Sequence, residues 1–143
     1  MIELKDDHVN DVKRGSIYWY DFKTAILPVL VIQNNTGNKY SDFTIIIKMN
    51  SSESLKNKKD RIPTIVNIQK HEIVSTPKKA KGLKEDGYLL TSDIFTIPKN
   101  TLKSYIGFLL PSSFPKVEKA LKISLGITYE KELSLDDICS NEI

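Results

Sequence analysis

The amino-acid sequence predicts a mainly β protein, built as a small barrel-like sheet with one helix near its C-terminus. Between residues 16 and 110, short runs rich in β-branched and aromatic residues alternate with polar segments, as strands and their connections do. A convincing helical spacing of apolar residues occurs only in residues 112–126. The length of 143 residues is typical of one domain. Together these features favour a sheet with a late helix packed across it.

The first strand is expected over residues 16–22, and both of its faces are largely apolar. Its side chains alternate between Ile17, Trp19 and Asp21 on one face and Tyr18, Tyr20 and Phe22 on the other. A strand of this kind belongs in the interior of a barrel or sandwich. Consecutive aromatic residues such as Tyr18, Trp19 and Tyr20 can stack RNA bases, but more often they pack in a core.

Two further strands follow at short spacing. The second is expected to begin at Pro28 and to run through residues 29–32. A turn is expected after it, at residues 34–38, where Gly37 can adopt a positive φ. The third strand is expected over residues 42–49, because this run is rich in β-branched residues.

The second half of the predicted sheet is less regular. Residues 61–69 alternate as in a half-buried strand, and residues 71–84 are expected to form a loop. Residues 87–97 predict either a strand pair or one bent strand. Residues 104–110 predict a last strand before the helix.

The predicted helix has a recognisable start and end. Ser112 or Ser113 can cap it, Pro115 lies in its first turn, and Gly126 ends it. Its expected apolar face consists of Phe114, Val117, Leu121, Ser124 and Leu125.

The charges divide the chain unevenly. Residues 128–143 contain one Lys and five acidic residues, a net charge of −4, whereas residues 1–127 contain 20 basic and 13 acidic residues, a net charge of +7. We therefore expect a flexible leader at residues 1–13, a folded domain at residues 14–127 and an acidic tail at residues 128–143. A basic body suggests an anionic partner such as nucleic acid, although the same charges also serve solubility.

Several classes of site are disfavoured by the residues present. Cys139 is the only cysteine, which excludes an internal disulfide, and no basic residue or His adjoins it to make it a nucleophile. His8 and His71 are isolated from each other and from other ligand types, so no metal site is expected. The longest apolar runs are too short to cross a membrane and the N-terminus is charged, so we expect a cytoplasmic protein.

Five segments occur in order between residues 12 and 127: VKRGSIYWYDF, PVLVIQNNTGNKYSDFTII, IPTIVNI, GLKEDGYLL and VEKALKISLGI. In this order they resemble the MazF/PemK-like family of toxin ribonucleases. The resemblance implies an SH3-like barrel that forms a homodimer, binds single-stranded RNA in a groove across the dimer and cuts it without a metal or other cofactor. It also implies an antitoxin peptide that blocks this groove.

The positions at which the resemblance implies chemistry depart from the family pattern. In such a cut the ribose 2′-hydroxyl attacks the adjacent phosphate, which requires a base and a donor or cation. Leu27 stands where the family usually has an Arg or Lys, and Asn50 stands where the catalytic Thr would be. The amide of Asn50 can hold a phosphate oxygen but is a poor proton acceptor. Ser51 is the candidate substitute, so Asn50 and Ser51 are the candidate catalytic residues.

Two other segments also differ from the family. Ile65 stands where the family often has a His, and residues 92–97 read SDIFTI where the family has a Glu-Gln-Ile-Arg-Thr-Ile type of strand. Basic residues cluster around the third and fourth strands, next to Asn50, where they could neutralise RNA phosphates. These candidate RNA-binding residues are Lys48, Lys56, Lys58, Lys59 and Arg61. A solvated charged loop is an equally good interpretation of this cluster.

Two functional hypotheses follow. The first is a single-stranded RNA-binding toxin-family protein with a metal-independent endoribonuclease activity rebuilt on Asn50 and Ser51. The second is a catalytically silent member that acts as an RNA- or peptide-binding module. A weaker third hypothesis is that the acidic tail covers the basic groove.

Overall fold

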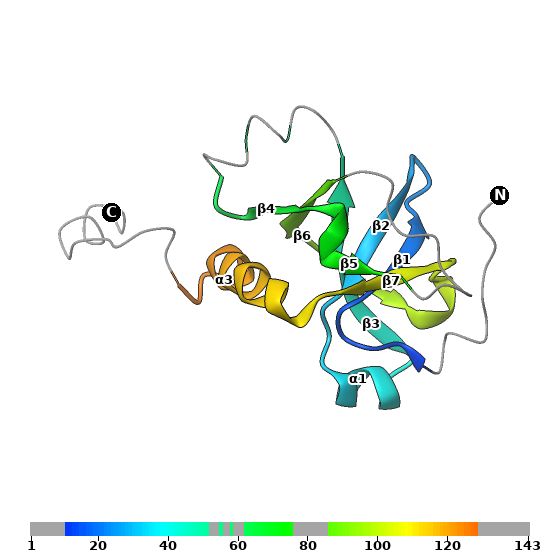
Figure 1. Cartoon of the computed structure of the whole chain (residues 1–143). Helices are drawn as coiled ribbons and strands as arrows, with labels where there is room; N and C mark the ends of the chain where they lie inside the picture. The colour runs from blue at the N-terminus through cyan, green and yellow to red at the C-terminus, as the bar shows by residue number, and fades with distance from the viewer. Residues whose placement is uncertain (1–10, 52–54, 56–57, 59–61, 76–85, 129–143) are drawn as a thin grey trace.

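The computed structural model describes residues 11–51, 55, 58, 62–75 and 86–128 (Figure 1). The prediction of a mainly β fold with a C-terminal helix is confirmed. Seven strands form one antiparallel sheet in the order β4-β6-β3-β2-β1-β7-β5. The strands are β1 (Ser16–Asp21), β2 (Ile26–Val31), β3 (Phe43–Asn50), β4 (Ile65–Ile68), β5 (Ile73–Val74), β6 (Gly87–Pro98) and β7 (Tyr105–Leu109).

The first three strands lie where the alternation predicted them, and they build two faces. Ile17, opposite Leu30, belongs to a core cluster on one side of the sheet. Tyr18, opposite Val29, belongs to a second cluster on the other side. The expectation that β1 is an interior strand is therefore confirmed. Tyr18 is 1% exposed and packs edge-on against Tyr105 at 5.4 Å between ring centroids, as a core residue does.

Helix α3 (Phe114–Ser124) covers the face that carries the first cluster, beside β4 and β6 (Figure 1). The buried helix residues are Val117, Ala120 and Leu121. Gly126 ends the helix with φ of +76°, as predicted. Leu125 is 60% exposed, so its place on the predicted apolar face is wrong, because the helix ends before bringing it round to the sheet.

The capping of the helix differs from the prediction, whereas the placement of Ser124 agrees with it. Ser113 is the residue at its start, but the Ser113 hydroxyl donates to Glu72 Oε1 at 2.7 Å and does not cap the helix. Ser124 does face the sheet, where its hydroxyl donates to the carbonyl of Thr91 at 2.7 Å.

The turn predicted at residues 34–38 is instead the start of a short helix, α1 (Asn35–Tyr40). Asn34 caps it, because its Oδ1 accepts from the backbone N–H of Gly37 at 2.7 Å. A positive φ at Gly37 was therefore a wrong prediction, since the residue lies within the helix. A Cβ at Gly37 would lie 2.9 Å from Cδ of Gln33, so a larger residue here would require the Gln33 side chain to shift.

The segment after the third strand also differs from the prediction. β4 covers only residues 65–68 of the strand expected over 61–69. The loop expected over 71–84 contains β5, which pairs with β7 at the far edge of the sheet, after a 3-10 turn η2 (Lys70–Glu72). Two-residue strands carry too little alternation to be read from sequence.

β6 is one bent strand, which was one of the two alternatives. Its pairing with β3 shifts by three residues, from Ile47 opposite Ile94 to Lys48 opposite Leu90. Residues 91–93 therefore form a bulge.

The N-terminal boundary of the folded body also differs from the expectation. Val12 is 3% exposed within the second cluster, so the folded body includes a residue of the expected leader.

Candidate nucleic-acid interface

Lys48 and Asn50 lie on the same face of β3, because they are two residues apart on one strand. Asn50 is the last residue of β3 and lies opposite Tyr88 of β6. Ser51 follows directly and is exposed. The structure thus brings together Lys48, Asn50 and Ser51 from the predicted site, at the end of one strand.

Of the other predicted cations, Lys58 alone lies within the described residues. Lys58 is exposed, and its backbone carbonyl accepts from the N–H of Ile62 at 2.9 Å. Lys56, Lys59 and Arg61 lie outside the described residues.

Lys48 has an acidic partner that sequence reasoning did not identify. Its Nζ lies 3.3 Å from Oδ2 of Asp93 in an ion pair. The side chains are only partly exposed, at 26% for Lys48 and 39% for Asp93. The carboxylate therefore occupies the position at which an anionic ligand would approach the ammonium group.

The bulge in β6 places Asp93 at this position. The amide and the hydroxyl of Thr91 both donate to the carbonyl of Thr64, at 3.0 and 2.7 Å. The carbonyl of Thr91 accepts from Ser124 of α3. These contacts fix the backbone of the bulge at Thr91, two residues before Asp93.

An aromatic ring, that of Phe22, adjoins Lys48, and two further rings pack against Phe22. Lys48 Nζ lies 5.7 Å from the centroid of the Phe22 ring, which lies 5.3 Å from the Phe95 ring. Tyr20 packs edge-on against Phe22 at 4.8 Å. Phe95 is 38% exposed, and Phe22 is half-buried. Phe22, Phe95, Lys48 and Asp93 are hereafter called the ring and ion-pair surface.

Leu27 lies next to this surface. It is half-buried and opposite Tyr20 in the β1–β2 pairing, on the same face as Val29 and Lys48. An isobutyl group cannot supply the bidentate donors of an arginine. The resemblance implies an arginine or lysine at the first of two positions and an arginine at the second, where this face carries Leu27 and Phe95.

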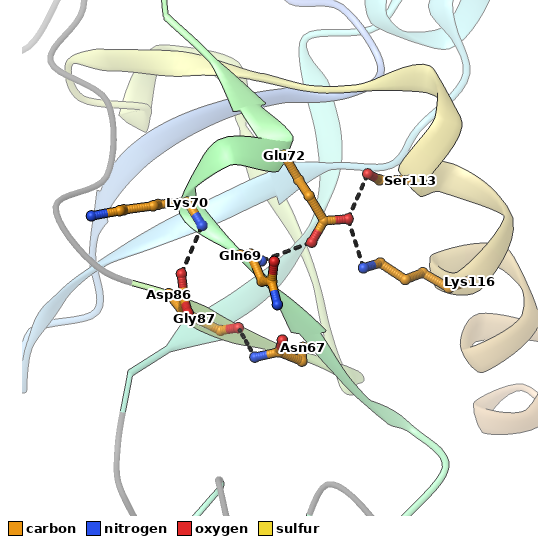
Figure 2. Close-up of polar contacts among 8 residues, drawn as sticks. All are labelled: Asn67, Gln69, Lys70, Glu72, Asp86, Gly87, Ser113 and Lys116. Atoms are coloured by element: carbon orange, nitrogen blue, oxygen red, sulfur yellow. Dashed lines mark hydrogen bonds and ion pairs between the residues drawn. The ribbon is translucent and has the colours of Figure 1, made fainter.

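A second polar cluster, around Glu72, has a structural role (Figure 2). The Glu72 carboxylate accepts from Lys116 Nζ at 2.6 Å, from Ser113 Oγ at 2.7 Å and from the backbone N–H of Gln69 at 2.8 Å. Burial alone would raise the pKa of Glu72, but the hydrogen bonds from Lys116, Gln69 and Ser113 together hold it below its ordinary value of 4.5. The cluster fastens the start of α3 to η2.

The described part of the chain also bears on a metal centre and on a membrane span. Among these residues no group of three or more His, Cys, Asp or Glu side chains is placed to hold a metal ion. No helix within them is long and apolar enough to cross a membrane.

Comparison with solved structures supports the fold class. The fold is similar to an endoribonuclease in complex with its cognate antitoxin from a mycobacterial species, with a TM-score of 0.63 at 24% identity over 82% of this chain and 98% of that one. It is also similar to the MazE–MazF structure from Deinococcus radiodurans, with a TM-score of 0.59 at 16% identity over 82% and 97% of the two chains. These likenesses establish the fold.

The family is established by sequence. A model of the PemK-like, MazF-like toxins of type II toxin–antitoxin systems matches residues 13–125. The chain is also 36% identical over 123 residues to an Endoribonuclease MazF of Staphylococcus epidermidis, covering 81% of this chain and 92% of that protein. The chain therefore belongs to the MazF/PemK-like toxin family, as its sequence motifs indicated.

Proposed function

We propose that this protein binds single-stranded RNA at the end of β3 and cleaves it without a metal ion. The observation that carries the proposal is that Lys48 and Asn50 share one face of β3, with Ser51 directly after them. A cation, an amide and a hydroxyl at one strand end can hold a phosphate group. The similarity to the Staphylococcus epidermidis endoribonuclease supports RNA as the substrate.

In the proposed reaction, the ribose 2′-hydroxyl attacks the adjacent phosphate and the chain breaks at the 5′-oxygen. The side-chain N–H of Asn50 and the ammonium of Lys48 donate to the phosphate oxygens as negative charge develops. The Ser51 hydroxyl lies within the same short segment and is the candidate to relay the proton of the attacking hydroxyl, because it can accept that proton while it passes its own to solvent water. Solvent water then returns a proton to the leaving 5′-oxygen, so the products are a 2′,3′-cyclic phosphate and a free 5′-hydroxyl.

The test is a gel assay of purified protein on a long single-stranded RNA in the presence of EDTA. Discrete fragments that disappear in Asn50→Ala or Ser51→Ala support the proposed reaction. The matched controls are Asn100→Ala and Ser112→Ala, two exposed positions elsewhere in the fold. Cleavage that persists unchanged in all four variants would contradict the proposed roles of Asn50 and Ser51.

A second candidate function is a nuclease-silent binding module. The observation that favours it is the chemical character of the face, where Leu27 and Phe95 replace cations and Asp93 neutralises Lys48. RNA that is bound but stays intact in the same assay would favour this candidate. Binding of a peptide without RNA binding would place the protein among the antitoxin-binding proteins only.

We further propose that the protein is a cytoplasmic homodimer, with a folded body close to residues 14–127, and that it pairs with an antitoxin. Solved relatives include complexes with an antitoxin. Light scattering on the purified protein tests the dimer, and copurification of a small acidic protein from the native host tests the antitoxin.

A further inference from the structure

We propose that Asp93 is a built-in competitor for the phosphate of a bound nucleotide, held on Lys48 until single-stranded RNA displaces it. The inference rests on the proposed function and deepens it. It assigns a regulatory counter-ion to the RNA site and a stacking surface to Phe95 and Phe22.

The Asp93 carboxylate lies at the ammonium group of Lys48. Oδ2 of Asp93 lies 3.3 Å from Lys48 Nζ, where a phosphate oxygen would lie if Lys48 bound RNA. Both groups are partly exposed, so solvent and a larger anion can reach the pair. An ion pair at such exposure is weak, and a phosphate group can replace the carboxylate.

Asp93 is held in place by the fold. The bulge of β6 is anchored through Thr91. Its hydroxyl donates a hydrogen bond to the carbonyl of Thr64 before β4, and its carbonyl accepts one from the hydroxyl of Ser124 at the end of α3. Asp93 therefore stays near Lys48 after displacement and competes at a high local concentration. The protein therefore binds RNA with a lower affinity than it would if Lys48 had no carboxylate partner.

The surface beside this ion pair is aromatic. Phe95 is 38% exposed and Phe22 adjoins both Phe95 and Lys48. A ligand that fits this surface has a flat ring to stack and an anionic group beside it. A nucleotide of single-stranded RNA has both, and base stacking on aromatic side chains tolerates any base.

The experiment measures binding of a fluorescein-labelled oligonucleotide by anisotropy over a series of salt concentrations. Every ribose carries a 2′-O-methyl group, so cleavage cannot change the probe. The variants are Asp93→Asn, Lys48→Gln and the double variant. The matched control is Asp42→Asn, an exposed aspartate before the opposite end of β3 that gives the same change in net charge.

Asp93→Asn is expected to bind about fivefold more tightly than wild type at about 0.1 M salt, because one more phosphate contact releases counterions. The slope of log affinity against log salt should become steeper by about 0.7, the value for one contact on a single strand. The increase in RNA affinity caused by Asp93→Asn should be larger than the increase caused by Asp42→Asn. It should disappear when Lys48→Gln is also present.

A further variant tests the rings. Phe95→Leu keeps the apolar character and is expected to weaken binding by about fivefold or more, because a stacked base is lost. The salt slope should stay unchanged, since no charge is removed. Thermal melting of each variant confirms that it is folded before its affinity is compared.

The outcomes separate this inference from the proposed function. If wild type binds RNA and Asp93→Asn gains no more than Asp42→Asn, the counter-ion role is wrong and RNA binding stands. If no variant binds RNA, both proposals are overturned. If only Asp93→Asn binds measurably, the counter-ion role is supported directly.

Discussion

Asn38 organises the connection between β2 and β3. It is 2% exposed, and its Oδ1 accepts from Thr44 Oγ1 at 2.6 Å and from Gln33 Nε2 at 3.1 Å. Its Nδ2 donates to the Gln33 carbonyl at 2.9 Å, and its own carbonyl accepts from the buried Lys99 at 2.7 Å. The polar run after β2 is thus a buried network in which these groups satisfy one another.

Asn38→Ala should lower the free energy of unfolding by about 3 kcal/mol, because the hydroxyl of Thr44 and the Gln33 carbonyl lose buried partners. Urea denaturation followed by Trp19 fluorescence measures the change. Asn100→Ala, at an exposed position, is the control and should change stability by about 0.5 kcal/mol or less. Equal effects of the two substitutions would contradict a stabilising role of the network.

At the scale of elements, the attachment of α3 depends on contacts between residues far apart in sequence. Glu72 is separated from its two partners in the helix start by 41 and 44 positions. Glu72 in η2 binds Ser113 and Lys116 at the start of the helix (Figure 2). The apolar side of α3 packs on the sheet through Val117 and Leu121. The Glu72 carboxylate therefore adds polar contacts at the N-terminal end of α3, next to the apolar contacts that the helix makes with the sheet.

The contribution of Glu72 to stability should depend on pH. Its pKa is lower in the folded protein than its ordinary value of 4.5, so the folded state favours the charged form. The contribution is present above the unfolded-state pKa and is lost as the pH falls through the folded-state pKa. Wild type should therefore lose this part of its stability below about pH 4.5.

Glu72→Gln should lower the free energy of unfolding by about 1–2 kcal/mol near pH 7, because a charge-assisted contact is lost. The difference from wild type should shrink as the pH falls below about 4.5. Urea denaturation at a series of pH values measures both effects. Glu118→Gln, which removes a half-exposed carboxylate of α3 paired with Arg14, is the control. A difference that stays constant with pH would contradict this account.

At the scale of the whole molecule, charge is divided between a basic body and an acidic C-terminal segment. Residues 1–127 have a net charge of +7 and residues 128–143 a net charge of −4. RNA is a polyanion, so its association with the body should be opposed by the acidic segment over distances near the Debye length.

Replacing the five acidic residues of 128–143 by their amides raises the net charge from +3 to +8 at unchanged length. We expect tighter RNA binding at low salt and affinities that converge with wild type at high salt, because screening removes a long-range effect. Anisotropy titrations at several salt concentrations measure this. An affinity gain that persists undiminished at high salt would instead indicate direct competition by the acidic segment for the site.

The elements of the fold could largely be predicted because alternation and helical spacing are local properties of the chain. β1, β3, β7 and α3 lie close to their predicted positions for this reason. α1 was mistaken for a turn because Asn and Gly favour both turns and helix starts, and the buried contacts of Asn38 with Thr44 and Gln33 cannot be read from the local sequence.

The candidate site could be predicted only in part. Lys48, Asn50 and Ser51 are neighbours in sequence, so one strand assignment brings them together. Asp93 is 45 positions from Lys48, and Phe95 is 73 positions from Phe22. Their contacts depend on the pairing of β6 with β3 and on the three-residue shift within that pairing.

By itself, the sequence determined the family, the strand succession and the alternating faces of β1 and β3, because these depend on residue identity and near neighbours. Only the tertiary structure decided that Lys48 has a carboxylate partner, that the rings of Phe22 and Phe95 adjoin one another near it and that Glu72 holds α3. Those contacts join distant segments, and their geometry depends on how the whole sheet curls and packs against the helix.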